Sequence, residues 1–290
     1  MTLEPMEPSH RESTLPSTDP LAIPTPVGTF DALAAGPVDG RPVLLLHGFP
    51  ESAEQWEHQL AVLAAAGYRA IAVDQRGYSP GVRPTEVEAY VPEELIGDAV
   101  AVADALGWPR FDLVGHDWGA AVAWMTAAAH PERLRTLSAV STPHGAAFSK
   151  ALRSDPDQRK RSQYFELFRT PGAAERELLE EGGLRRLYDG LPIERIEPYV
   201  ERFSAPGALT AALNWYRAMR PPRRRDPITT PTLYVWSTGD AFIGESAARG
   251  VEQHVAGPYR FEVLHGVSHW ISEEAPERLS ALLLEHLARY

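Results

Sequence analysis

The chain has 290 residues, of which 44% are hydrophobic and 23% charged, so it is long and apolar enough to bury a sizeable core. Acidic residues outnumber basic ones by 39 to 28, and the formal net charge of −11 disfavours nucleic acid and anionic membranes as partners. The absence of cysteine excludes disulfides, thiolate nucleophiles and cysteine-ligated metals.

The first 26 residues are rich in Pro, Ser, Thr and Glu, and they contain neither a basic cluster nor an apolar run. This composition is untypical of a signal peptide or a membrane anchor, and it predicts a disordered tail over residues 1–26. No stretch of the chain approaches the roughly 18 consecutive apolar residues that a membrane-spanning helix needs. We therefore expect a cytoplasmic protein without a membrane partner.

Short apolar segments and longer helix-like segments alternate over the first half of the chain. The apolar runs have the length of strands and lie at 43–46, 70–73, 111–114 and 137–140, and the helix-like segments between them lie at 53–66, 93–106 and 120–130. This alternation predicts right-handed crossovers and a parallel sheet with helices on both faces.

The alternation is interrupted after about residue 144. Residues 145–225 are rich in charge, with periodic Leu and aromatic residues and frequent Gly and Pro, which predicts a cap of short helices inserted between two strands. We expect the run Arg223-Arg224-Arg225 to be a solvated hinge rather than a binding patch. The predicted core domain comprises residues 27–144 and 226–290, with further strands at 232–236 and 259–263 and a helix at 274–287.

Asp117 lies between Gly115 and Gly119, at the junction of an apolar strand and a small-residue helix. This spacing is typical of the nucleophile elbow, with Asp where the common pattern has Ser. The glycines allow a strained turn and a close approach of strand and helix. The Asp117 side chain would then be exposed at the carboxyl end of the sheet, where ligands bind in open α/β folds. Taken alone, the pattern also fits an Asp that caps a helix.

Three motifs follow one another in the order typical of one enzyme family, namely HGFP at 47–50, DQRGY at 74–78 and GHDWG at 115–119. With these motifs the chain resembles the epoxide hydrolases and the related haloalkane dehalogenases over roughly residues 27–289. The resemblance implies an α/β-hydrolase fold, which has a mostly parallel central sheet, helices on both faces and an inserted helical cap.

The same resemblance implies roles for individual residues. Asp117 would be the nucleophile, and the backbone N–H groups of Phe49 and Trp118 would form an oxyanion hole. The Phe49–Pro50 peptide bond would be cis, which a turn tolerates at small cost. Two further residues match family positions and are interpreted as structural residues rather than metal ligands: His47 and His116.

An ester formed on the nucleophile must be hydrolysed, which needs a histidine to deprotonate water and a carboxylate to orient that histidine. Asp240 follows one late strand and His269 follows the last, and both match the family's acid and base positions. The spacing of His265 and His269 also suits a metal pair on a helix, but Gly266 and the strand before it favour a loop. The loop at 140–145, where some dehalogenases have their acid, contains no carboxylate.

An aspartate nucleophile suits displacement at an sp³ carbon, whereas its attack on an ester would give an anhydride. Two such reactions are the opening of an epoxide, whose oxygen needs a strong donor, and the expulsion of a halide, which needs weak donors such as an indole N–H. Tyr164 and Tyr216 lie in segments that match those carrying the two cap tyrosines of epoxide hydrolases. We predict that both donate to the epoxide oxygen, although either one alone would also fit a packing role.

The sequence therefore predicts an epoxide hydrolase that converts a small, apolar epoxide to a vicinal diol without a metal or another cofactor. Two alternatives are a haloalkane dehalogenase with the same aspartate and a non-catalytic small-molecule binding protein of this fold. The dehalogenase has less support because Phe49 occupies the position next to Pro50 where those enzymes tend to have Asn or Glu. Trp118 occurs in both families, and Trp215 and Trp270 are interpreted as packing residues. The binding protein has less support because the residues for both chemical steps are present.

Overall fold

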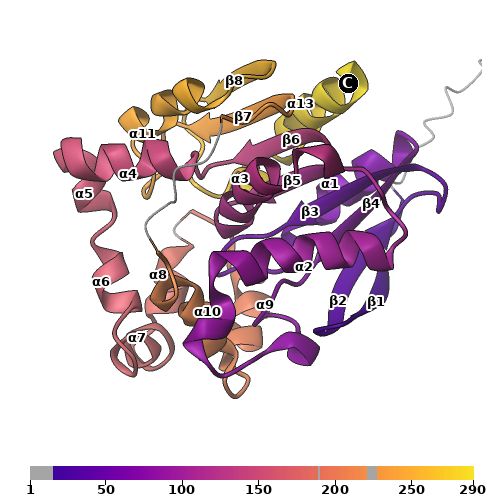
Figure 1. Cartoon of the computed structure of the whole chain (residues 1–290). Helices are drawn as coiled ribbons and strands as arrows, with labels where there is room; N and C mark the ends of the chain where they lie inside the picture. Colours follow the sequence, from indigo (N-terminus) through magenta and orange to yellow (C-terminus); the bar gives the residue numbers. More distant parts are fainter. Residues whose placement is uncertain (1–15, 189, 221–226) are drawn as a thin grey trace, which may run out of the picture.

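The computed structural model describes residues 16–188, 190–220 and 227–290. Its centre is an eight-stranded sheet with the order β1-β2-β4-β3-β5-β6-β7-β8 (Figure 1). The strands from β3 to β8 pair in parallel, whereas β1 and β2 pair antiparallel, so the sheet is mostly parallel, as predicted. The strands are β1 Asp19–Thr25, β2 Gly28–Ala35, β3 Arg41–Leu46, β4 Tyr68–Val73, β5 Phe111–His116, β6 Leu134–Val140, β7 Thr232–Ser237 and β8 Tyr259–Leu264.

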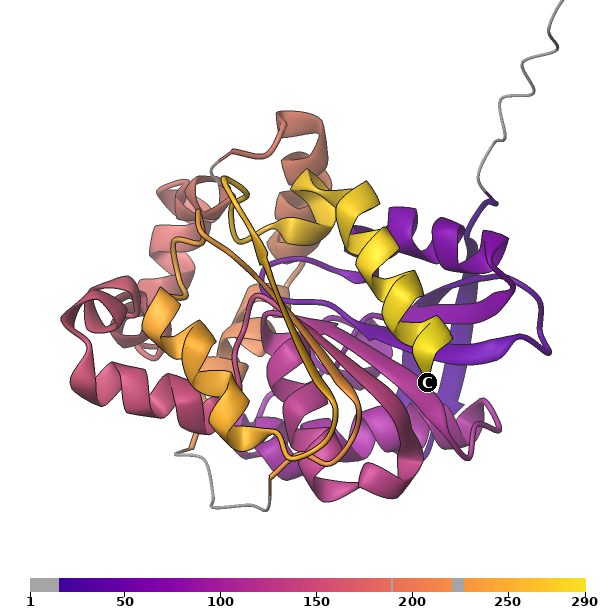
Figure 2. The same cartoon turned by 90° about the horizontal axis from the view of Figure 1, so that it is seen from above.

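The apolar runs that predicted strands are buried on both faces of the sheet. In β3, Leu44 belongs to one hydrophobic cluster and Val43 to another on the opposite face, because successive side chains of a strand point to opposite sides. Helices contribute to both clusters, so both faces are covered, as predicted (Figure 2). The first face is covered by α2 (Pro92–Ala105) and α3 (Trp118–Ala129), and the second by α1 (Glu57–Ala65) and α13 (Pro276–Arg289).

The segment between β6 and β7 is helical, and Figure 1 shows its helices gathered beside the carboxyl ends of the parallel strands. Its helices are α4 Gly145–Ser154, α5 Pro156–Arg161, α6 Tyr164–Phe168, α7 Ala173–Glu175, η5 Arg176–Glu180, α8 Gly183–Leu187, α9 Ile193–Ser204 and α10 Ala208–Arg217. These helices fall within the segment 145–225 for which the sequence predicted a cap. The predicted hinge, Arg223-Arg224-Arg225, lies outside the described residues.

Short helical segments follow several strands and turns of the core. They are η1 Ala53–Trp56, η2 Pro80–Val82, η3 Val87–Tyr90, η4 Pro131–Arg133, α11 Glu245–Arg249, η6 Gly250–His254 and α12 Ile271–Glu274. In the described part of the chain, no helix is both long enough and apolar enough to cross a membrane.

The prediction of a disordered tail over residues 1–26 is wrong for its second part. Residues 19–25 form β1, which pairs antiparallel with β2 at the edge of the sheet. Ile23 in this strand is only 2% exposed and belongs to the main hydrophobic cluster. The prolines in this segment suggested disorder, but an edge strand tolerates proline because a missing N–H on its open side costs no ladder hydrogen bond. Residues 1–15 lie outside the described residues.

Candidate active site

Asp117 follows β5 directly and precedes α3, at the turn that the sequence predicted. Its φ of 49° and ψ of −117° are rarely adopted by residues other than glycine. A Cβ atom at Gly115 would lie 2.3 Å from the Gly119 carbonyl oxygen, and one at Gly119 would lie 2.1 Å from the Leu46 carbonyl oxygen. Only glycine therefore fits at both flanking positions. The Asp117 side chain makes no capping hydrogen bond to α3, every residue of which is described, so the helix-cap interpretation is not favoured.

Three polar side chains from different strand ends meet at this turn. His269 Nε2 lies 3.5 Å from Asp117 Oδ2, and His269 Nδ1 lies 2.8 Å from Asp240 Oδ2. The second carboxylate oxygen of Asp240 accepts hydrogen bonds from the backbone N–H groups of Phe242 (2.8 Å) and Ile243 (2.9 Å). Asp240 is only 1% exposed, so its carboxylate is fixed on both sides and holds the histidine ring with Nε2 toward Asp117. The structure thus brings the predicted nucleophile, acid and base together.

The charges of these groups depend on one another. Burial alone would lower the pKa of His269, but the charges of Asp240 and Asp117 and the hydrogen bonds to both carboxylates raise it to about 10. Burial opposes the ionisation of Asp117, but its hydrogen bond with His269 and the positive charge of that ring outweigh burial and lower the pKa of Asp117. With a pKa of about 10, His269 is a cation at neutral pH, and its positive charge favours the ionised form of Asp117.

A buried network holds the backbone of His269. The His269 carbonyl oxygen accepts a hydrogen bond from Ser141 Oγ at 2.9 Å and lies 3.0 Å from His116 Nε2. On the other side of the ring, His116 Nδ1 lies 2.9 Å from Glu51 Oε2, and both of these side chains are fully buried. These contacts fit the prediction that His116 is a structural residue rather than a metal ligand. Sequence reasoning did not single out Glu51, although a charged residue directly after the apolar HGFP motif was a signal that could have found it.

The remaining histidines of interest are not arranged as metal ligands. His47 Nδ1 lies 2.8 Å from the Gly48 carbonyl oxygen, and His47 Nε2 accepts a hydrogen bond from the Gln75 N–H at 3.1 Å, so both of its nitrogens are used locally. His265 is exposed in the loop between β8 and α12 rather than on a helix with His269. Among residues 16–188, 190–220 and 227–290, no three His, Cys, Asp or Glu side chains are grouped as metal ligands would be.

The backbone around Phe49 is turned toward the carboxylate of the elbow. The Phe49–Pro50 peptide bond is cis, as predicted. The Phe49 N–H donates a hydrogen bond of 2.9 Å to Asp117 Oδ1. Trp118, whose N–H is the second predicted oxyanion donor, is the first residue of α3 and follows Asp117 directly. The Phe49 N–H therefore binds an oxygen of the Asp117 carboxylate in the free protein. During hydrolysis of an ester on Asp117, the predicted oxyanion would form on this same group.

Tyr164 at the start of α6 and Tyr216 near the end of α10 lie side by side, with ring centroids 6.2 Å apart. The Tyr216 ring packs against Trp118 (5.1 Å) and Phe49 (5.5 Å), which are the two predicted oxyanion residues. Burial and the negative charge of Asp117 raise the pKa of both tyrosines well above the usual value, so both phenols stay protonated. Two protonated phenols therefore share an aromatic-walled site with the carboxylate of Asp117.

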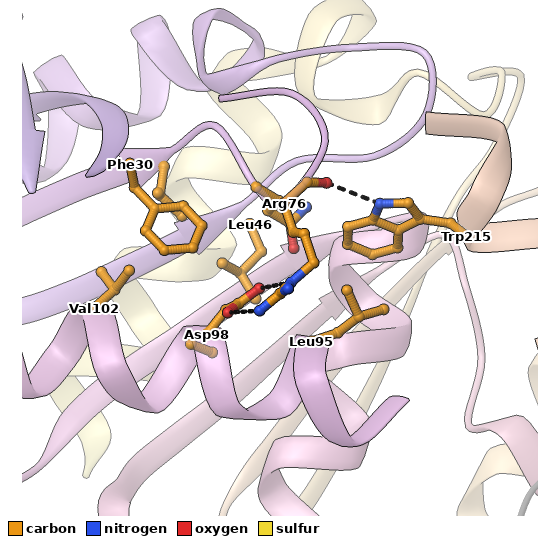
Figure 3. A pocket seen from close by; sticks show the side chains of 10 residues that line it. Phe30, Leu46, Arg76, Leu95, Asp98, Val102 and Trp215 are labelled. Atoms are coloured by element: carbon orange, nitrogen blue, oxygen red, sulfur yellow. Dashed lines mark hydrogen bonds and ion pairs between the residues drawn. The ribbon is translucent and has the colours of Figure 1, made fainter. Parts of the chain in front are cut away.

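The segment that carries Tyr216 is anchored to the core through its neighbour Trp215 (Figure 3). Trp215 Nε1 donates a hydrogen bond of 2.9 Å to the Arg76 carbonyl oxygen, and the Arg76 guanidinium binds both carboxylate oxygens of Asp98 at 2.7 and 2.6 Å. The cavity beside this ion pair, of about 10 Å³, has room for one water molecule at most and not for a substrate. Because the Trp215 N–H is bound to the protein, Trp215 is a packing and anchoring residue rather than a halide donor.

Comparisons with known proteins agree with this architecture. The model of the alpha/beta hydrolase fold family matches residues 41–276. The AB hydrolase superfamily protein YfhM of Bacillus subtilis is 35% identical over 89% of this chain and 94% of its own length. Epoxide hydrolase 4 of Mus musculus is 34% identical over 88% of this chain and 75% of its own length. A solved structure, from work on novel epoxide hydrolases in metagenomes from hot environments, is 31% identical, with a TM-score of 0.85 over 94% of this chain and 99% of that one.

Proposed function

Because the chain belongs to the epoxide hydrolases of the α/β-hydrolase fold family, we propose that it opens an epoxide to a vicinal diol through a covalent ester on Asp117. The observation that carries the proposal is the carboxylate of Asp117 at the strained turn, with its Oδ2 3.5 Å from His269 Nε2, while His269 Nδ1 lies 2.8 Å from Asp240 Oδ2. In this proposal the helices from α4 to α10 form the cap, which supplies Tyr164 and Tyr216, and the eight-stranded sheet with the helices on its two faces forms the core. The aromatic walls of the site favour a small, apolar epoxide.

In the first step, Asp117 Oδ2 attacks the less hindered ring carbon of the epoxide from the side opposite the oxygen. A carbon–oxygen ester bond forms as the ring carbon–oxygen bond breaks. Tyr164 and Tyr216 donate hydrogen bonds to the departing oxygen, which takes a proton from one of them. The raised pKa of each phenol is suited to this role, because a phenol that stays protonated at neutral pH can donate.

In the second step, His269 takes a proton from water, and the resulting hydroxide attacks the ester carbonyl carbon of Asp117. The oxyanion that forms is stabilised by the backbone N–H groups of Phe49 and Trp118, and one such donor is commonly worth about 3 kcal/mol. The ester carbon–oxygen bond then breaks, the departing alkoxide takes the proton of the carboxyl group left on Asp117, and the diol leaves. The carboxylate of Asp117 is restored, with one oxygen derived from the water.

The first step prepares the base for the second. In the free protein the charge and the hydrogen bond of Asp117 contribute to the high pKa of His269, which is therefore a cation at neutral pH and a poor base. Ester formation removes the negative charge of Asp117, so the pKa of His269 falls, and the ring gives up its proton to restore the phenol that was deprotonated in the first step, while Asp240 continues to orient the ring. His269 thus becomes an effective base once the ester is present.

A single-turnover experiment in ¹⁸O-labelled water tests the two-step route. With enzyme in excess over styrene oxide, we expect the first diol to contain no label, because its new oxygen comes from Asp117. One ¹⁸O atom should instead be found in the peptide that contains Asp117, by mass spectrometry after digestion. Label that enters the diol directly in the first turnover would contradict the ester and indicate attack by water on the epoxide.

Replacement of either cap tyrosine is expected to slow ring opening. Tyr164→Phe and Tyr216→Phe should each lower kcat/KM for styrene oxide by about 10²-fold, since each removes one donor to the departing oxygen, and the double variant should lose more. Steady-state assays of diol formation measure both. A matched control is Tyr90→Phe, because Tyr90 is also a buried tyrosine but donates to the Pro84 carbonyl oxygen away from the site. A double variant as active as the Tyr90→Phe control would refute the role of the phenols.

A further inference from the structure

The helix α5 lies against the segment that begins with Asp240. Gln158, which is fully buried, donates a hydrogen bond of 2.8 Å from Nε2 to the Phe242 carbonyl oxygen and accepts one of 2.8 Å at Oε1 from the Gly244 N–H. Three residues further along the helix, Arg161 Nη1 donates to the Asp240 carbonyl oxygen at 2.5 Å. Two side chains of the inserted segment therefore bind the backbone of the loop that carries the acid of the triad.

The carboxylate of Asp240 depends on the same stretch of backbone. Its Oδ1 accepts the N–H groups of Phe242 and Ile243, and the Ile243 carbonyl oxygen accepts a hydrogen bond of 3.1 Å from Trp236 Nε1. The fit of α5 on this loop is close, because a Cβ atom at Gly244 would lie only 3.3 Å from Gln158 Oε1. A shift of the backbone at 242–244 would therefore move the donors that orient the carboxylate.

The acid loop also contains Phe242, whose ring lines the active site. The Phe242 ring lies edge-to-face against His269, with ring centroids 4.9 Å apart, and against Tyr164 at 5.4 Å. Gln158 holds the carbonyl group of this same residue. The position of the loop thus affects the base directly, through ring packing, as well as through the carboxylate of Asp240.

We propose that Gln158 and Arg161 are positioning residues that clamp the acid loop, and thereby set the orientation of Asp240 and His269. The proposal rests on the proposed function and extends it by assigning to α5 a part in ester hydrolysis. Neither residue touches the reacting atoms. Their contribution is to hold a hydrogen-bonded geometry, in which a displacement of about 1 Å can cost roughly 10²-fold in rate.

The two chemical steps depend on this geometry to different degrees. Alkylation uses Asp117, which is already ionised and is held by the elbow and by the Phe49 N–H. Ester hydrolysis uses His269, whose orientation depends on Asp240. Loosening of the acid loop should therefore slow hydrolysis more than alkylation, so that the ester accumulates during turnover.

The test is the fraction of protein that carries the ester during steady turnover of styrene oxide, measured by rapid acid quench and intact-protein mass spectrometry. Gln158→Met keeps the bulk of the side chain and removes its two hydrogen bonds to the acid loop, together with the one from Nε2 to Ser162 Oγ within the cap. We expect ester hydrolysis to slow by about 10- to 100-fold, with alkylation much less affected, so the ester fraction should rise above that of the wild-type protein. Partial unfolding would lower this fraction rather than raise it, so a structural defect alone cannot give the expected result.

Arg161 provides a second, partly exposed position at which the same effect should appear. Arg161→Met should raise the ester fraction, whereas Arg161→Lys retains a donor and should restore most of the wild-type behaviour. Ser246→Ala is the matched control, because Ser246 Oγ donates to Asp155 at the start of α5, and its loss removes a contact of the same helix that does not involve residues 240–244. This variant should leave the ester fraction unchanged.

The outcomes distinguish the two proposals. Wild-type protein that turns epoxide over, together with unchanged ester fractions in Gln158→Met and Arg161→Met, would overturn the role of α5 alone. Wild-type protein that neither hydrolyses styrene oxide or a wider epoxide panel nor forms an adduct would overturn the proposed function, and the role of α5 with it. A raised ester fraction in both Met variants, with Arg161→Lys and Ser246→Ala close to wild type, would support the role of α5 as a clamp on the acid loop.

Discussion

The His269→Gln variant is expected to lose turnover of styrene oxide by at least about 10³-fold and to gain the mass of one whole epoxide per protein chain. Glutamine cannot take a proton from water, so the ester on Asp117 should form and then persist. Loss of the His269 charge removes one cause of the low pKa of Asp117, so ester formation should be slower than in the wild-type protein, but the Phe49 N–H continues to bind the carboxylate. Intact-protein mass spectrometry before and after exposure to the epoxide measures the gain.

The control for this result is an Asp117→Ala/His269→Gln double variant, which should gain no mass. Exposure of His269→Gln to 1-bromobutane separates the two reactions that an aspartate nucleophile permits. A gain equal to the butyl group, seen with the bromide and not with epoxides, would move the assignment to a haloalkane dehalogenase. If neither reagent nor a wider epoxide panel gave an adduct, a non-catalytic binding protein would be the better interpretation.

The Asp117→Ala variant is expected to have the largest loss of activity, at least about 10⁴-fold in kcat, because it removes the atom that forms the ester. The variant should still fold. A φ of 49° is strained for both Asp and Ala, so the substitution adds little backbone strain. It also removes a carboxylate whose ionisation is opposed by burial. Steady-state assays and circular dichroism during heating measure the two properties separately.

One further comparison makes this result specific to the nucleophile. Substitution Ser246→Ala, remote from the elbow, should give full activity in the same assay, which excludes a loss caused by expression or purification. Activity of Asp117→Ala within about tenfold of wild type would contradict the covalent route, since no other carboxylate in the triad can reach the substrate in its place: Asp240 is buried behind His269.

Several local features of this protein could be predicted from its sequence. The elbow was predictable because Gly115 and Gly119 exclude any Cβ atom, which leaves a recognisable spacing around Asp117. The strands of the parallel sheet were predictable because burial on both faces demands continuous apolar runs. Asp240 and His269 were predictable as loop residues after late strands, and the resemblance implied that they form a pair, but their 2.8 Å contact is seen only in the structure.

Other features escaped sequence reasoning for a physical reason. The edge strand β1 was assigned to a disordered tail, because its pairing with β2 is not visible in its own proline-containing composition. In the sequence, only its position after the HGFP motif distinguishes Glu51 from other charged residues. Its carboxylate reaches His116 only because its loop packs against β5 in the folded protein. The part played by Gln158 depends on a helix and a loop separated by more than 80 positions along the chain.

The sequence by itself thus determined the kinds of element, the turn that holds Asp117, and the residue types available for a two-step reaction. These depend on period, steric exclusion and side-chain chemistry, which act over a few neighbouring residues. Only the tertiary structure decided that Tyr164 and Tyr216 lie side by side near Asp117, and that α5 holds the acid loop through Gln158. Such contacts are set by how buried surfaces of distant elements fit together, and no local pattern records that fit.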